Sequence, residues 1–134
     1  MTKADSVSNQ IIGAAIRVHK KFGPGLLESV YAPCLGQELL ELGLDVEIGT
    51  PLSLEHNGLC VKRAYVLDLR VENCVIVEVK CVRKIEDIHI AQLLTYLRLT
   101  GMALGLLINF NVTVLKSGIR RVVNNHVDDQ GNRL

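Results

Sequence analysis

The chain has 134 residues, of which 49% are apolar and 4% aromatic, and it contains no tryptophan. This composition excludes a disordered chain and predicts one domain, residues 1–134, with an aliphatic core of the kind built from strands under helices. The 15 Lys and Arg residues nearly balance the 14 Asp and Glu residues, which argues against indiscriminate binding to nucleic acid.

The charges are unevenly distributed along the chain. Residues 22–61 hold six acids and no Lys or Arg, so the rest carries 15 basic and 8 acidic residues, a net charge of +7. A basic face can therefore form on a nearly neutral protein.

Neither the apolar segments nor the cysteines indicate export or a membrane. The polar first ten residues lack the apolar region of a signal peptide, and the longest apolar run, residues 102–108, is too short to span a bilayer. Four isolated cysteines without zinc-like spacing are expected to be reduced, buried thiols: Cys34, Cys60, Cys74 and Cys81. We therefore expect a soluble, cytoplasmic protein.

The amino-terminal part predicts two helices. Apolar residues recur at helical spacing from a cap at Asp5 or Ser6 to about Phe22. A second helix is expected over about residues 26–42. Pro33 inside it predicts a kink or a late start, because proline lacks the backbone N–H.

Three strands follow these helices. Residues 45–55 and 59–71 alternate loosely around a His-Asn-Gly turn signal and predict a hairpin, whose second strand is long enough to bend or bulge. Residues 75–80 form an apolar strand whose two charges, Glu78 and Lys80, project from one face. An unpaired buried charge costs on the order of several kcal/mol, so this pair must be mutually satisfied, metal-bound or catalytic.

The loop between the last two strands decides where Asp68 lies. A three-residue loop pairs Val71 with Val75 and sets Asp68 opposite Glu78 on the same face, whereas a two-residue loop would put the two carboxylates on opposite faces. We predict the three-residue loop or an equivalent bulge.

The remaining chain predicts one more helix. It covers about residues 88–99, and Gln92 and Tyr96, four apart, share one side of it. Two strands and a polar, flexible tail are expected at residues 103–109, 119–123 and 124–134.

Two carboxylates that face each other repel unless something neutralises them, and a hard divalent cation with oxygen ligands would do so. Magnesium suits Asp68 and Glu78 best, because it takes one or two carboxylates together with water and substrate phosphate. A neighbouring Lys80 could orient a water nucleophile and stabilise the charge that develops on phosphorus. The pattern therefore predicts metal-assisted hydrolysis of a phosphodiester.

Each of these signals has an ordinary structural explanation when taken alone. Glu78 and Lys80 can form a surface salt bridge, and Glu28 in a first helical turn suits the helix dipole. Gln92 and Tyr96 can be an amphipathic pair. No P-loop, dinucleotide fingerprint, GxSxG elbow or zinc motif supports a different chemistry.

Taken in order, these residues resemble the PD-(D/E)XK nuclease superfamily. Asp68, the Glu-Val-Lys run at residues 78–80 and the QxxxY helix at residues 92–96 are similar to its RecB-like branch, and residues 25–31 match the motif that names the GxxExxY family. The resemblance covers residues 11–123. It implies a single-domain α/β fold with a restriction-endonuclease-like core, in which helices flank a central mixed sheet.

The resemblance also implies a metal site. Asp68, Glu78 and the backbone carbonyl of Val79 would bind Mg²⁺, with Mn²⁺ as an alternative, and Glu28 would complete the acidic site as a further metal ligand. The superfamily's function implies nucleic acid as the partner, with DNA favoured over RNA. A homodimer would let a small nuclease grip a large duplex, although no residue demonstrates one.

The same likeness assigns catalytic roles to the other residues. Lys80 would activate water, and Gln92 and Tyr96 would support the site or touch the phosphate. Val66 and Ile90 depart from the usual arginine and glutamate of relatives, and Arg17 stands where an acid is common, changes that concern substrate contacts more than metal binding. The alternative is a catalytically inactive nucleic-acid-binding or protein-interaction module with the same fold.

Overall fold

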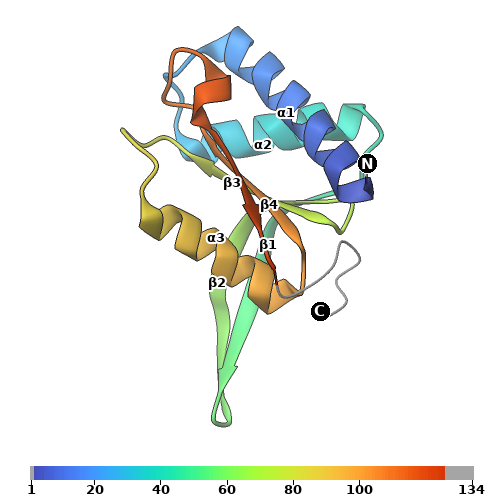
Figure 1. Ribbon diagram of the computed structural model, residues 1–134, viewed down its shortest axis with the longest axis vertical. Coiled ribbons are helices and arrows are strands. Elements are labelled where there is room, and N and C mark those ends of the chain that lie inside the picture. Colours follow the sequence, from blue (N-terminus) through green and yellow to red (C-terminus); the bar gives the residue numbers. More distant parts are fainter. Residues whose placement is uncertain (1, 126–134) are drawn as a thin grey trace.

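The computed structural model of the chain describes residues 2–125, and the predicted elements appear in the predicted order (Figure 1). They are α1 (Lys3–Phe22), α2 (Glu28–Glu41), β1 (Val46–His56), β2 (Leu59–Val71), β3 (Val75–Lys80), α3 (Asp87–Thr100), β4 (Leu104–Asn109), the 3-10 turn η1 (Leu115–Gly118) and β5 (Ile119–Val123).

The five strands form one sheet in the order β1-β2-β3-β4-β5. Strands β3 and β4 are parallel and the other neighbours are antiparallel, so the sheet is mixed. Helices α1 and α2 cover one face and α3 covers the other (Figure 1). The predicted α/β fold with a mixed sheet flanked by helices is confirmed.

The central strands are buried because both faces of the sheet are covered. Val75, Val77 and Val79 lie in the cluster under α1 and α2, while Ile76 lies in the cluster under α3. All six residues of β4 are buried as well. The end of β3 that carries Glu78 is therefore held inside the body of the protein.

Helix α1 begins earlier than predicted. Its cap is Thr2, whose hydroxyl accepts a hydrogen bond of 3.0 Å from the backbone N–H of Asp5, while the Asp5 carboxylate accepts one from the Thr2 N–H. This reciprocal capping box pairs two N–H groups that a helix start leaves free, so the prediction of Asp5 or Ser6 as the cap was wrong. Helix α2 begins at Glu28, close to the predicted start, and keeps Pro33 inside, so a late start at Pro33 is not found.

The hairpin of β1 and β2 projects beyond the rest of the sheet, at the bottom of Figure 1. Its pairing register shifts between Leu52 and Leu54, which confirms the expected bend or bulge. All residues from 55 to 63 are exposed, Cys60 among them. The expectation of buried thiols was therefore wrong for Cys60, because the hairpin extends beyond the layers that would cover it, and the other three cysteines are half-buried.

The end of the described chain is anchored to the body. Asn124 is buried, and its backbone N–H donates a hydrogen bond of 2.8 Å to the Ala103 carbonyl. The prediction of a flexible tail from residue 124 was therefore wrong for Asn124, and residues 126–134 of that prediction lie outside the described part. None of the helices within residues 2–125 is long and apolar enough to cross a membrane.

Candidate active site

The loop between β2 and β3 has three residues, and Val71 pairs with Val75 as predicted. The ladder between these strands ends at Leu69 and Val77, one position before Asp68 and Glu78. At this point the carboxylate of Glu78 accepts a hydrogen bond of 2.8 Å from the backbone N–H of Asp68. The carboxylate of Asp68 accepts one of 2.8 Å from the N–H of Val79. Because β2 and β3 separate here, each carboxylate takes the place of a backbone carbonyl as the acceptor for an N–H of the opposite strand.

A change of face in β2 accompanies this opening. Leu69 lies in the cluster under α1 and α2, whereas Leu67, two residues away, lies in the cluster under α3. Simple alternation would put both on one face. Gly49, which lies between the β1 partners of these two leucines, has a φ of +70°, a conformation that glycine adopts without strain. The departure from alternation therefore coincides with Asp68.

The two carboxyl groups share a poorly solvated site. Glu78 is 5% exposed, and burial followed by the charge of Asp68 raises its pKa to about 8. Burial also raises the pKa of Asp68, an effect that the Val79 N–H and Lys80 oppose and Glu28 reinforces. A positive charge placed between the two carboxylates would lower the pKa values of both Asp68 and Glu78.

Lys80 is the cation nearest in sequence to these carboxyls, and its charge acts to lower the pKa values of both Asp68 and Glu78. Within residues 2–125, however, no ion pair within 4.0 Å joins the Lys80 ammonium to a carboxylate. The explanation of Glu78 and Lys80 as a simple salt bridge therefore lacks support. The ammonium is close enough to act on the site, and no ion pair with another described residue engages it.

Glu28 approaches the same site from the first residue of α2. Its carboxylate accepts a hydrogen bond of 2.8 Å from the backbone N–H of Cys81, the residue after Lys80. Glu28, Asp68, Cys81 and Asn111 line one open cleft of about 750 Å³. The cleft thus brings two of the predicted acids, Glu28 and Asp68, to one surface, while Glu78 and Lys80 are not among the residues that line it.

Tyr96 and Gln92 differ in how they relate to the site. Tyr96 is 9% exposed, and its ring lies 5.2 Å from that of Tyr65. Burial raises the pKa of Tyr96, and the charges of Glu78 and Asp68 add to the effect, so its hydroxyl lies within their electrostatic range. Gln92 is exposed, and its side chain makes no hydrogen bond to another residue of the described chain.

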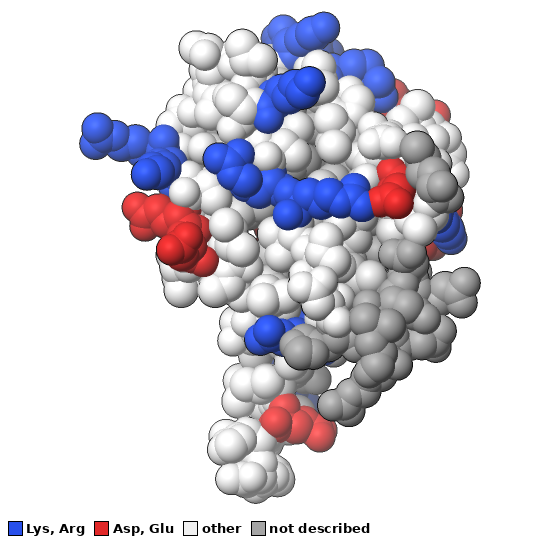
Figure 2. All heavy atoms as spheres, viewed as in Figure 1, with Lys and Arg blue, Asp and Glu red and all other residues white. Residues whose placement is uncertain are grey.

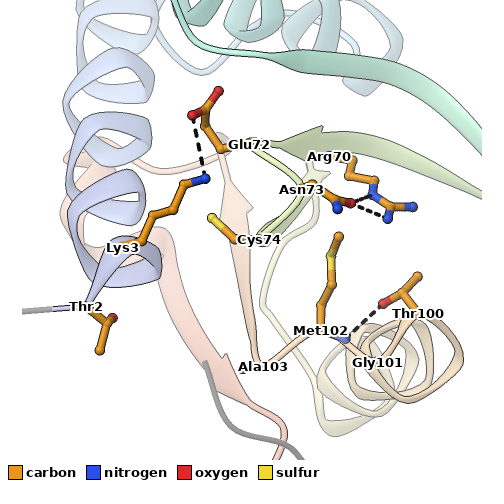
Figure 3. Close-up of a pocket in the computed structure, with 10 residues that line it drawn as sticks. All are labelled: Thr2, Lys3, Arg70, Glu72, Asn73, Cys74, Thr100, Gly101, Met102 and Ala103. Atoms are coloured by element: carbon orange, nitrogen blue, oxygen red, sulfur yellow. Dashed lines mark hydrogen bonds and ion pairs between the residues drawn. The ribbon is translucent and has the colours of Figure 1, made fainter. Parts of the chain in front are cut away.

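A second hollow, of about 670 Å³, lies at the other end of β3 (Figure 3). It contains the Lys3–Glu72 ion pair at 4.0 Å and the contact of Arg70 with Asn73. Cys74, just before β3, also lines it. None of the predicted site residues lines this hollow, so the candidate chemistry belongs to the cleft at the carboxyl end of β3.

The comparison with protein families was made on the whole sequence. A model of the PD-(D/E)XK nuclease superfamily matches residues 5–122. The chain belongs to this superfamily. Its members are in general nucleases that use divalent metal ions, which implies nucleic acid as the class of substrate. Searches of curated proteins and of solved structures found no significant match.

The donor chemistry of this PD-(D/E)XK chain fits a hard divalent cation. Asp68 and Glu78 offer carboxylate oxygens. The N–H and the carbonyl of one strand residue point toward the same neighbouring strand, so the Val79 carbonyl faces β2, where its N–H binds Asp68. Residues 2–125 contain no cluster of three or more His, Cys, Asp or Glu side chains that could hold a metal ion. An ion such as Mg²⁺, which takes several ligands from water and phosphate, suits this donor set.

Sequence reasoning missed two residues that organise the site. The Tyr31 hydroxyl donates a hydrogen bond to the Gly23 carbonyl and accepts one of 3.1 Å from the Leu26 N–H. Its ring stacks on Phe110 with the ring centroids 4.3 Å apart. Asn109 binds the backbone after Lys80. The only available signals were a tyrosine three residues after Glu28 and an asparagine that ends an apolar strand.

Proposed function

We propose that this chain is a magnesium-dependent nuclease that hydrolyses phosphodiester bonds, with DNA favoured over RNA and Mn²⁺ as an alternative ion. The single observation that carries the proposal is the opening between β2 and β3. There each of the two carboxylates, of Asp68 and of Glu78, accepts a hydrogen bond from the backbone of the opposite strand. Lys80 lies beside them and forms no ion pair within the described chain.

In this proposal Asp68, Glu78 and the carbonyl of Val79 would hold the metal ion, and Glu28, whose carboxylate binds the Cys81 N–H, would complete the acidic site beside it. When bound, the ion supplies Lewis-acid polarisation of the scissile phosphate and of a nucleophilic water. The raised pKa of Glu78, about 8, means that ion binding at neutral pH displaces the Glu78 proton. Glu78 is therefore largely a charged ligand at neutral pH only when the ion is bound.

Lys80 acts on the water and on the phosphate. Its ammonium lies within electrostatic range of both carboxylates and orients the water while it stabilises negative charge on the phosphate oxygens. Tyr96 supports the site from α3, and Gln92, one turn earlier and exposed, contacts the substrate phosphate. The exposed Arg83 and Lys84 follow Lys80 in the loop and offer further cations to the backbone of the nucleic acid.

The surface is consistent with this use. Lys and Arg side chains gather over the body of the protein on the face shown in Figure 2. This agrees with the uneven distribution of charge along the sequence. A basic body beside an acidic, metal-binding cleft is the arrangement that a phosphodiester substrate needs.

We further assign the chain to the RecB-like branch and the GxxExxY family. Two contacts support this assignment. The Glu of that motif, Glu28, binds the Cys81 N–H after β3, and its Tyr, Tyr31, binds the loop before α2, so each has a structural role. The proposal also includes a cytoplasmic location, which the four free thiols support, and a single domain over residues 1–134.

A homodimer completes the proposal. Leu59 and Val61, near the tip of the projecting hairpin, are 60% and 40% exposed, and large apolar side chains of this kind are commonly buried at subunit contacts. Sedimentation of the wild type and of a Leu59→Ser variant tests this part. A monomeric wild type at micromolar concentration would remove the dimer from the proposal without affecting the nuclease.

The nuclease itself is tested by cleavage of single- and double-stranded DNA and RNA in Mg²⁺ or Mn²⁺. We expect cleavage that EDTA abolishes and that Asp68→Asn and Lys80→Ala reduce by at least about 10³-fold. Glu55→Gln, on the exposed hairpin, serves as the matched control and should keep full activity. A wild type that binds nucleic acid but cuts none of these substrates would instead indicate the inactive module.

A further inference from the structure

Asn109 is a buried polar residue at the end of an otherwise apolar strand. Its side chain is nearly inaccessible, as the residue is 2% exposed, and it follows five apolar or glycine residues of β4. Burying an amide costs free energy unless its donor and acceptor are both paired. An asparagine is therefore expected at this position only if its hydrogen bonds serve a purpose.

Both polar ends of the Asn109 side chain bind the backbone of one residue, Val82, in the loop after β3. The backbone N–H of Val82 donates to Oδ1 at 3.1 Å, and Nδ2 donates to the Val82 carbonyl at 2.9 Å. The amide of Asn111 adds a second donor to the same carbonyl at 3.2 Å. The last residue of β4 thus binds both the N–H and the carbonyl of Val82, two residues after Lys80.

Lys80 itself is held by the neighbouring residue. Lys80 and Asn109 are the last pair of the parallel ladder between β3 and β4, and the Phe110 N–H donates to the Lys80 carbonyl at 2.9 Å. Beyond this pair the strands separate, and a strand end without further bonds would fray. The contacts of Asn109 with Val82 extend the connection past the end of the ladder.

We propose that Asn109 is a positioning residue for Lys80, an inference that rests on the proposed nuclease function. The Lys80 side chain forms no ion pair within residues 2–125, so its location depends on where its backbone is held. Paired residues of neighbouring strands project to the same face, which sets the Asn109 side chain beside that of Lys80. Because the Asn109 amide is buried and fully engaged, it does not touch the substrate.

The test compares Asn109→Asp with a matched control, Asn57→Asp. The aspartate at 109 keeps the shape and the acceptor for the Val82 N–H, but it sets an oxygen against the Val82 carbonyl in place of the Nδ2 donor. Asn57 lies in the exposed hairpin turn, where the same change leaves the site untouched. If Asn109→Asp does not fold, Asn109→Leu, which removes both hydrogen bonds without adding charge, takes its place.

The first measurement needs no enzyme activity. Spectra of protein labelled at the lysine ε-carbon report the surroundings of each ammonium, and Lys80→Arg assigns the Lys80 signal. We expect the Lys80 signal to shift or broaden in Asn109→Asp and to stay unchanged in Asn57→Asp. An unchanged Lys80 signal in a folded 109 variant overturns the proposal, even if the wild type proves to be no nuclease.

The second measurement separates positioning from general damage. In Asn109→Asp we expect kcat to fall by about 10²-fold while KM and the Mn²⁺ affinity stay unchanged, since a displacement of about 1 Å has effects of this size. A loss of Mn²⁺ affinity as large as the loss in kcat would overturn the proposal, because it would show that the whole site is disturbed. An unchanged kcat would overturn it as well.

Discussion

The backbone N–H of Asp68 donates a hydrogen bond of 2.8 Å to the carboxylate of Glu78. This bond stands where the ladder between β2 and β3 would have continued beyond Leu69 and Val77. It fixes a second carboxyl group beside the first at a point that water reaches poorly. Burial, and then the charge of Asp68, therefore raise the pKa of Glu78 to about 8.

The stability of the metal-free protein should fall as pH rises. Between 4.5, the ordinary pKa of the group, and about 8, folded protein keeps the Glu78 proton that unfolded protein has released. The free energy of unfolding should therefore decrease across this window by on the order of a few kcal/mol. Above pH 8, Glu78 should contribute no further change. Urea denaturation in EDTA at pH 5, 7 and 9 measures the effect.

Glu78→Gln is the control for this prediction, because the amide keeps the shape of the side chain and does not titrate. Its free energy of unfolding should lose most of the dependence on pH between 5 and 8. A wild type that becomes more stable over this range would show that Glu78 is ionised in the folded, metal-free protein.

Divalent ions should stabilise the folded protein at neutral pH. An ion that binds only the folded state raises the free energy of unfolding by about 2.7 kcal/mol at a concentration 100 times its Kd. Because binding displaces the Glu78 proton, the gain at a fixed Mg²⁺ concentration should grow from pH 6 to pH 8. Thermal denaturation with Mg²⁺ and EDTA measures it, and Asp68→Asn should show no gain. An equal shift in both proteins would place the ion elsewhere.

The register at this site was predictable from the sequence because it depends on local counting. A loop of three residues between Val71 and Val75 fixes which residues of β2 and β3 lie opposite each other, whereas the change of face between Leu67 and Leu69 does not follow from such counting. The roles of Asn109 and Tyr31 were not predictable in this way. Asn109 binds the backbone of Val82, 27 residues away, and backbone atoms carry no sequence signal. Gln92 shows a different limit, since it lies in α3 four residues before Tyr96 but its side chain has no partner within residues 2–125.

The Tyr31 hydroxyl should stabilise the loop that leads into α2. It links the Gly23 carbonyl and the Leu26 N–H, just before Glu28. Tyr31→Phe keeps the ring that stacks on Phe110 and removes only these bonds, so we expect a loss of about 1 to 2 kcal/mol in the free energy of unfolding. Urea denaturation measures this loss.

Tyr65→Phe is the matched control for the hydroxyl of Tyr31. The Tyr65 hydroxyl makes no hydrogen bond within the described chain, so its removal should change the free energy of unfolding by less than about 0.5 kcal/mol. In a nuclease assay Tyr31→Phe should also lower kcat, because Glu28 would be less firmly placed. Equal stabilities of the two variants would mean that the loop is held by packing alone.

Gly118 should tolerate no side chain, because of the backbone next to it. A Cβ added there would lie 2.2 Å from the Asn109 carbonyl oxygen, whereas one added at Gly25 meets nothing within 4 Å. Backbone cannot move aside as a flexible side chain can, so Gly118→Ala should lower the free energy of unfolding by about 3 kcal/mol and Gly25→Ala should leave it nearly unchanged. Since the same clash displaces the residue that holds Val82, Gly118→Ala should also perturb the Lys80 signal in lysine-labelled spectra. A stable variant with an unperturbed signal would show that η1 shifts away from β4 at little cost.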